Sequence, residues 1–117
     1  MSGEPSKELQ TLKAEFFRAM AHPARIRILE VLSDAGEHSV QALQARLSVD
    51  QPVVSQQLAK LRAHGVVTAR KEGTTVIYAL ADPRIADLLK VARDILNARL
   101  SGSRTLLHEL RRHALRT

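Results

Sequence analysis

The spacing of apolar residues predicts four helices in the first 64 residues, separated by short polar breaks. In the first helix the apolar residues recur at three- and four-residue intervals, which is the period of one helix face. They are Leu9, Leu12, Phe16 and Met20. Because the residue before a proline avoids the helical conformation, a break is expected at the first His-Pro pair. The predicted helices cover Ser6–Ala21, Pro23–Ser33, Val40–Leu47 and Val49–His64.

The second predicted helix interleaves two arginines with its apolar residues. Arg25 and Arg27 can contact phosphate or bond within the protein, and we favour the structural role for Arg25. His22, just before this helix, is interpreted as a packing or capping residue rather than a metal ligand.

The fourth predicted helix has an apolar face, with Val54, Leu58 and Leu61, and a polar face rich in amides. Short amides and a hydroxyl suit hydrogen bonding to base edges and phosphates better than ordinary solvation. Since a short helix and a tight turn come just before it, the pair is typical of a helix-turn-helix. The alternative is a solvated helix face without a partner. The candidate DNA-binding residues are Gln51, Ser55, Gln56, Gln57 and Lys60.

Two β-rich runs follow, at Val66–Glu72 and Thr75–Leu80, with the two-residue alternation of a half-buried hairpin. The tip carries Arg70, Lys71 and Thr74, which are further candidate DNA-binding residues. A basic hairpin directly after a recognition helix is expected to act as a wing that reaches phosphates or the minor groove.

The last third of the chain is predicted to form a helix from Pro83, a break at Ser101-Gly102-Ser103 and a final short helix. These helices are too apolar on one face for a small core to cover, so a second copy of the chain is the expected cover. The predicted dimer interface consists of Leu9, Leu12, Phe16, Leu106 and Leu110.

The predicted fold class is therefore mainly α with a small β-hairpin: a winged helix-turn-helix with about five or six helices. Residues 1–117 are expected to form one DNA-binding domain that dimerises through its first and last helices, residues 6–21 and 83–116.

Composition supports a polyanionic partner, because 18 Lys and Arg residues against 12 acidic residues give a net charge of +6. No apolar run approaches the ~20 residues of a membrane span, and the first residues lack the pattern of a signal peptide. A cytoplasmic protein without membrane contact is expected. The absence of cysteine excludes disulfides and thiolate metal sites.

Three motifs together resemble the ArsR family of bacterial winged-helix repressors. They are AHPARIRIL at Ala21–Leu29, SQQLAKLRAHGVV at Ser55–Val67 and GTTVIYAL from Gly73. The resemblance implies a homodimer with interlocked first and last helices. It also implies binding to an imperfect DNA palindrome, with half-sites about one turn apart, and repression relieved by an effector.

Matched by position, Gln51, Ser55, Gln56 and Gln57 fall where family members contact DNA, and Gln57 stands where many have histidine. The family's metal-sensing sites are not matched. Ser39 and Gln41 replace the cysteine pair of arsenic and lead sensors. Zinc and nickel sensors of the family have four ligands, of which this chain retains only Asp82. The other three positions hold Arg84, Ile95 and Ala98. No metal or other cofactor is expected at these sites, and the effector is unknown.

Two other functions stay open. A non-standard nickel or zinc site could form from His108, Glu109 and His113 across a dimer. A winged-helix module that binds protein or RNA is the other alternative. An enzyme is disfavoured because the sequence has no glycine-rich phosphate loop, no cysteine and no recognisable catalytic spacing.

Overall fold

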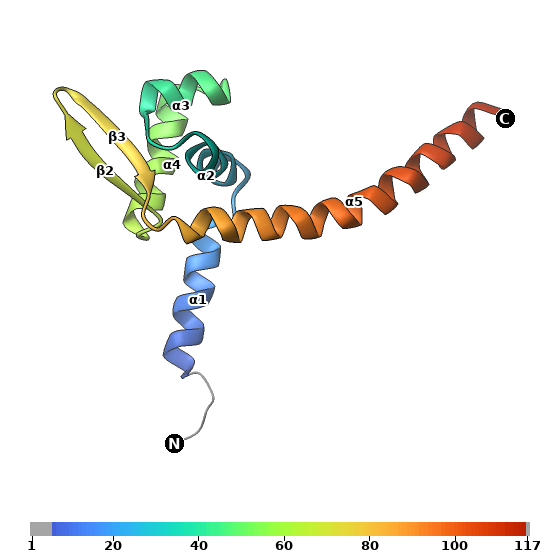
Figure 1. The fold of residues 1–117 in the computed structure, drawn as a ribbon, viewed down its shortest axis with the longest axis horizontal. Coiled ribbons are helices and arrows are strands. Elements are labelled where there is room, and N and C mark those ends of the chain that lie inside the picture. The colour runs from blue at the N-terminus through green and yellow to red at the C-terminus, as the bar shows by residue number, and fades with distance from the viewer. Residues whose placement is uncertain (1–5, 117) are drawn as a thin grey trace. The chain divides into compact units, whose positions relative to one another are not determined.

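The structure, a computed structural model, describes residues 6–116, except for the side chains of residues 103–107, 110 and 113–116 (Figure 1). Five helices and a three-stranded antiparallel sheet lie within this range. The helices are α1 (Lys7–Met20), α2 (Pro23–Ala35), α3 (Val40–Leu47), α4 (Gln51–Ala63) and α5 (Arg84–Arg116). The strands are β1 (His38–Ser39), β2 (Val67–Glu72) and β3 (Thr75–Leu80). The first four predicted helices and the hairpin are confirmed.

The chain divides into two compact units, one that ends at Ala86 and one that begins at Asp87. The first unit holds α1 to α4, the sheet and the start of α5, and the second holds the rest of α5. The single domain predicted for residues 1–117 stays a prediction. None of the helices that the structure describes combines the length and apolarity needed to cross a membrane.

The core of the first unit is built from leucine side chains on three helices. Leu29 on α2, Leu43 on α3, and Leu58 and Leu61 on α4 have no exposed surface. Val66, at the start of the wing, is also fully buried. Burial of apolar surface is the main favourable term in folding, so these contacts hold the helix-turn-helix against α2. The predicted apolar face of α4 is confirmed.

Side chains cap several helix ends in the first unit. The Ser6 hydroxyl accepts a hydrogen bond from the backbone N–H of Leu9 at 3.1 Å, and His22 Nδ1 accepts one from that of Ala24 at 3.1 Å. The predicted capping role of His22 is therefore confirmed. At the other end of a helix, Arg27 Nη2 donates to the backbone oxygen of Leu47 at 3.0 Å. A cation there also complements the negative end of the α3 dipole.

Gly65 follows α4 and ends it. It adopts φ of +70°, and its N–H bonds to the backbone oxygen of Arg62 while that of Val66 reaches back to Leu61. This pair of hydrogen bonds is a Schellman motif, which favours glycine because a side chain is strained at positive φ. The motif turns the chain directly into the wing.

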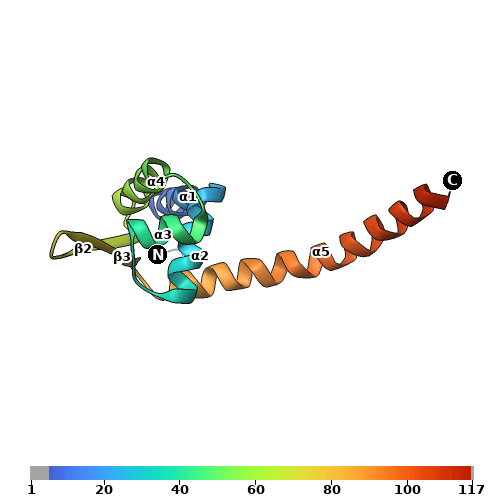
Figure 2. The same ribbon diagram turned by 90° about the horizontal axis from the view of Figure 1, so that it is seen from above.

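The sheet has the order β1-β3-β2, and the two-residue strand β1 was not predicted because it is too short to show a period. β2 and β3 pair from Val67 opposite Leu80 to Glu72 opposite Thr75. The loop between them is therefore only Gly73-Thr74, with Gly73 at φ of +63°. Figure 2 shows this hairpin extending away from the helices of the same unit.

The predicted break at residues 101–103 is wrong, because α5 runs without interruption from Arg84 to Arg116. A single glycine costs a helix only about 1 kcal/mol, which a long helix tolerates. The Ser101 hydroxyl also donates to the backbone oxygen of Asn97 at 2.9 Å, so its polar group is satisfied within the helix. At 33 residues, α5 is about 50 Å long.

Ser48, in the turn between α3 and α4, has a left-handed backbone with φ of +54°. Replacing it with glycine is expected to stabilise the protein by about 0.5–1 kcal/mol. The left-handed conformation costs a non-glycine residue about 1–2 kcal/mol, and the extra chain entropy of glycine offsets part of the gain. Thermal unfolding measures the effect. Ser48→Ala retains the Cβ and is the control; an equal gain from alanine would contradict the explanation.

Candidate nucleic-acid interface

The helix-turn-helix presents one face of α4 to solvent while the opposite face is fixed in the core. Val54, Leu58 and Leu61 are at most 1% exposed, so a large rotation of this helix would open the core. Asp50 occupies the N-cap position of α4, although its side chain makes no capping hydrogen bond. The first turn of α4 presents the backbone N–H of Gln51 and its exposed side chains, since Pro52 has no N–H and that of Val53 donates to the backbone oxygen of Asp50 at 3.0 Å.

Four of the five candidate residues on α4 have exposed side chains. They are Gln51, Ser55, Gln56 and Lys60. Three of the four are neutral hydrogen-bonding groups, which can both donate and accept. Gln56 can form a bidentate pair with the N6 and N7 atoms of adenine, and Lys60 can contact phosphate.

The prediction that Gln57 lies on the exposed face is wrong. Its side chain is 7% exposed, and its Oε1 accepts a hydrogen bond of 2.8 Å from Nε of Arg25 on α2. Arg25 Nη1 donates in addition to the backbone oxygen of Ala19 at 3.0 Å. An amide can occupy the buried face because this hydrogen bond offsets its desolvation. The structural role favoured for Arg25 is confirmed.

Two further exposed residues of α4 were missed from the sequence. Val53 is 40% exposed in the first turn, and Arg62 is exposed in the last. Val53 was not noticed because an isolated valine carries no polar signal, yet an apolar side chain can contact the methyl group of thymine. Arg62 adds a cation on the side of α4 that carries Ser55, since seven residues make almost two turns, whereas Lys60 lies about 140° around the helix from Ser55.

The wing presents fewer free charges than the sequence suggests. Lys71 and Thr74 are exposed, but Arg70 is paired with carboxylates on two sides. Its Nη2 lies 2.8 Å from Oε1 of Glu72, and its Nη1 pairs with Glu37 in the loop before β1. The hydrogen bonds that Arg70 donates to Glu72 and Glu37 raise the pKa of its guanidinium. A phosphate would have to compete with both carboxylates for this guanidinium.

Comparison with known proteins identifies this arrangement. A family described as "Helix-turn-helix domain" matches residues 20–70. The uncharacterized HTH-type transcriptional regulator Rv0081 of Mycobacterium tuberculosis is 46% identical over 106 residues, which cover 91% of this chain and 93% of that protein. Its crystal structure has a TM-score of 0.73 and 48% identity, with 84% of this chain and 98% of that chain covered.

Two more relatives are a helix-turn-helix repressor and a winged helix-turn-helix domain whose description names a family. The HTH-type transcriptional repressor SmtB of Mycobacterium tuberculosis is 40% identical over 85 residues, 73% of this chain and 62% of that protein. Mb0332 of Mycobacterium bovis is described as a homodimeric winged helix-turn-helix DNA-binding domain and a "possible ArsR-family transcriptional regulator". Its TM-score is 0.74 at 28% identity, with 87% and 95% of the two chains covered.

The chain belongs to the ArsR family. It is a DNA-binding transcriptional regulator with the winged helix-turn-helix fold, as the sequence predicts. That the exposed residues of α4 and of the wing contact DNA stays a prediction.

The residues predicted to form the dimer interface of this ArsR-family protein are only partly described. Leu9 and Leu12 are 44% and 61% exposed on α1, and Phe16 is half-buried with its ring 5.7 Å from that of Phe17. The side chains of Leu106 and Leu110 lie outside the described residues. Further apolar side chains on α1 and α5 are about half exposed, and all but Val91 belong to the apolar faces for which the sequence predicts a partner. They are Phe17, Val91, Ile95, Leu96 and Leu100.

The alternative metal site has little support in the described part of the chain. His108 and Glu109 are exposed, and the side chain of His113 lies outside the described residues. Among the described residues, no three His, Cys, Asp or Glu side chains lie close enough together to bind one metal ion. Asp82, the one residue that matches the family's sensing site, is hydrogen-bonded to the backbone and side chain of Arg84. These bonds lower the pKa of the Asp82 carboxyl to about 2.

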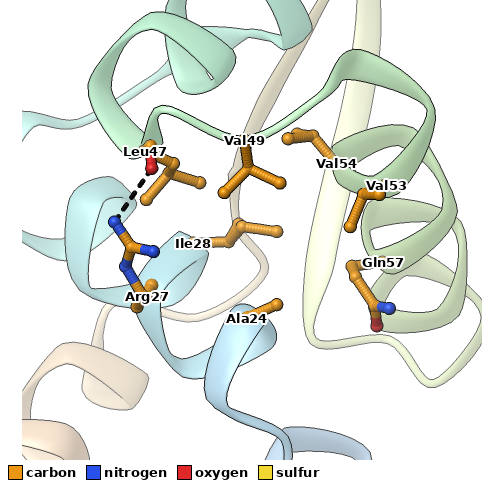
Figure 3. Close-up of a pocket in the computed structure, with 8 residues that line it drawn as sticks. All are labelled: Ala24, Arg27, Ile28, Leu47, Val49, Val53, Val54 and Gln57. Carbon is orange, nitrogen blue, oxygen red and sulfur yellow. Dashed lines mark hydrogen bonds between the residues drawn. The ribbon is translucent and has the colours of Figure 1, made fainter.

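A pocket between α2 and the helix-turn-helix is too small for an effector. Figure 3 shows its lining, in which Ile28 and Ala24 of α2 face Val53 and Val54 of α4, with Gln57 beside them. Its volume of about 10 Å³ is roughly that of one water molecule, whereas ligand pockets usually span roughly 300–1,000 Å³.

Proposed function

We propose that the protein is a homodimeric repressor that binds a palindromic operator through the exposed face of α4 and through the wing. The observation that carries this proposal is the exposed polar face formed by Gln51, Ser55 and Gln56 on a helix whose opposite face is buried in the core. A preformed surface of amides and hydroxyls fits base edges, and the net charge of +6 favours approach to DNA.

The dimer follows from the uncovered apolar side chains on α1 and α5. Val91, Ile95 and Leu96 are exposed on α5, and burial of their apolar surface would be favourable. A second copy of the chain carries the same apolar surface and can cover it. Mb0332 is described as homodimeric and SmtB as a repressor, which supports the same assembly and direction of regulation here. A two-fold axis would present two copies of α4, and half-sites about one DNA turn apart would match them.

We infer that the protein acts in the cytoplasm, where it would meet its DNA target, and that it catalyses no reaction. The effector that would relieve repression is not a metal at the usual family sites. Ser39 and Gln41 offer no thiolate, and Asp82 is occupied by Arg84.

Selection from a pool of random DNA duplexes tests the function directly. The wild-type protein is expected to enrich an imperfect palindrome and to protect both half-sites in footprinting. Sedimentation should give the mass of two chains at micromolar concentration. A pool that stays random after selection, or tight sequence-specific binding by a monomer, would contradict the proposal.

The wing is expected to act on all DNA sequences alike. Lys71→Ala should weaken binding to operator and random duplexes by the same factor. Because Lys71 is exposed and no described carboxylate pairs with it, its contact would be with phosphate. The slope of log K against log salt concentration should fall by about 0.9 for each lost phosphate contact.

Lys90→Ala is the matched control, since Lys90 is an exposed lysine on α5, outside the helix-turn-helix and the wing. It is expected to leave the salt slope unchanged. A Lys71 variant that loses sequence preference at an unchanged slope would mean that the wing reads bases.

A further inference from the structure

Gln57 is a buried polar side chain at the centre of the DNA-reading helix. Among the described residues it alone combines a polar side chain with less than 9% exposure. It occupies the apolar face of α4 beside Val54 and Leu61, where a leucine would pack without any desolvation cost. Packing alone therefore does not explain why this position holds an amide.

Its partner, Arg25, joins three helices with one guanidinium. From α2, the Nε atom donates to Gln57 on α4 at 2.8 Å, and Nη1 donates to the backbone oxygen of Ala19 in the last turn of α1 at 3.0 Å. The donors of a guanidinium are fixed in one plane, so the two bonds set directions as well as distances. No carboxylate among the described residues pairs with Arg25, so its position is not set by an ion pair within that part of the chain.

Such a connection controls rotation of α4 more tightly than apolar packing does. Side chains lie about 5–6 Å from a helix axis, so a rotation by about 20° moves them by about 2 Å. A shift of that size breaks a hydrogen bond, whose length ranges over only about 0.5 Å, but changes apolar contacts less sharply. Gln56, which points to solvent, is adjacent in sequence to Gln57 and turns with it.

We propose that Arg25 is a positioning residue for DNA reading: through Gln57 it fixes the rotation of α4, and through Ala19 it links that rotation to α1. The inference rests on the proposed function, in which α4 reads the operator and α1 contributes to the dimer. It gives Arg25 a role in discrimination between sequences, although Arg25 itself is held inside the protein by α1 and α4.

The test uses the full chain and three variants: Arg25→Met, Gln57→Leu and the double variant. The probes are a duplex selected from random DNA by the wild-type protein and the same duplex with its sequence shuffled. The ratio of the two affinities measures discrimination, and thermal unfolding measures stability. The double variant replaces a half-buried polar pair with apolar residues of similar size, a change that is often neutral or stabilising.

We expect the double variant to unfold at or above the wild-type temperature and to discriminate about tenfold less, with binding to the shuffled duplex changed less than threefold. Gln57→Leu alone should lose discrimination to the same extent, because either change removes the same connection. Arg27→Met is the matched control. It removes the neighbouring arginine of α2, which bonds to α3 and not to α4, and should retain discrimination.

The outcomes separate this inference from the function on which it rests. Full discrimination by stable Gln57→Leu and double variants would overturn the positioning role while the proposed function stands. An equal loss in Arg27→Met would also overturn it, since any damage to α2 would then suffice. A wild-type protein that binds the selected and shuffled duplexes equally would refute sequence reading itself, and the inference with it.

Discussion

Leu12→Asp is expected to dissociate the dimer and to lower operator affinity by more than 100-fold while the single chain stays folded. Leu12 is 61% exposed in one chain, so the change does not disturb the core of the chain itself. In the dimer the carboxylate would be buried without a partner, once on each side of the two-fold axis. An unpaired buried charge costs several kcal/mol, and every 1.4 kcal/mol is a factor of ten in affinity.

Sedimentation and DNA titration of the same preparations measure this effect. Ala14→Asp is the control, because Ala14 is exposed and lies about 200° around α1 from Leu12. It introduces the same charge into the same helix and should leave both dimer and DNA binding unchanged. If Leu12→Asp remains dimeric and binds its operator normally, this side of α1 is not the interface. Ile95→Asp makes the corresponding test on α5, where Ile95 is 52% exposed.

Gln56→Ala is expected to lower affinity for the specific site by about 5- to 150-fold, with little change in thermal stability. One bidentate contact to a base is worth about 1–3 kcal/mol, and Gln56 contributes nothing to the core because its side chain is exposed. Ser55→Ala should act in the same direction. Affinity for a shuffled duplex should change little, since neither residue carries charge.

Asn97→Ala serves as the control for the loss of a side-chain amide, because Asn97 is exposed on α5, beyond the first unit. Titration of operator and shuffled duplexes with all three variants gives the specific and non-specific affinities. If Gln56→Ala and Ser55→Ala both retain full operator affinity, the exposed face of α4 is not the surface that reads DNA.

Local signals in the sequence were sufficient for most of the first unit. Ser6 and Pro23 mark helix starts through short-range chemistry, and Gly65 and Gly73 mark a helix end and a tight turn because both sites have positive φ. The repeat of Val54, Leu58 and Leu61 identified the buried face of α4, since helical spacing places such residues together. These features depend on residues within a few positions of each other, and the sequence therefore predicts them.

The tertiary structure decided the features that depend on distant residues. Gln57 is polar, and the sequence therefore predicted it on the exposed face. Its side chain is buried because Arg25, 32 positions earlier, donates a hydrogen bond that offsets the desolvation cost. Arg70 forms an ion pair with Glu37 because β1 and β2 both pair with β3, and no local sequence pattern predicts this strand pairing. The continuity of α5 past Gly102 is a third case, because a long helix absorbs a local cost that would end a short one. Periodicity indicates which residues are apolar, whereas the position of a polar side chain depends on the partner that folding brings to it.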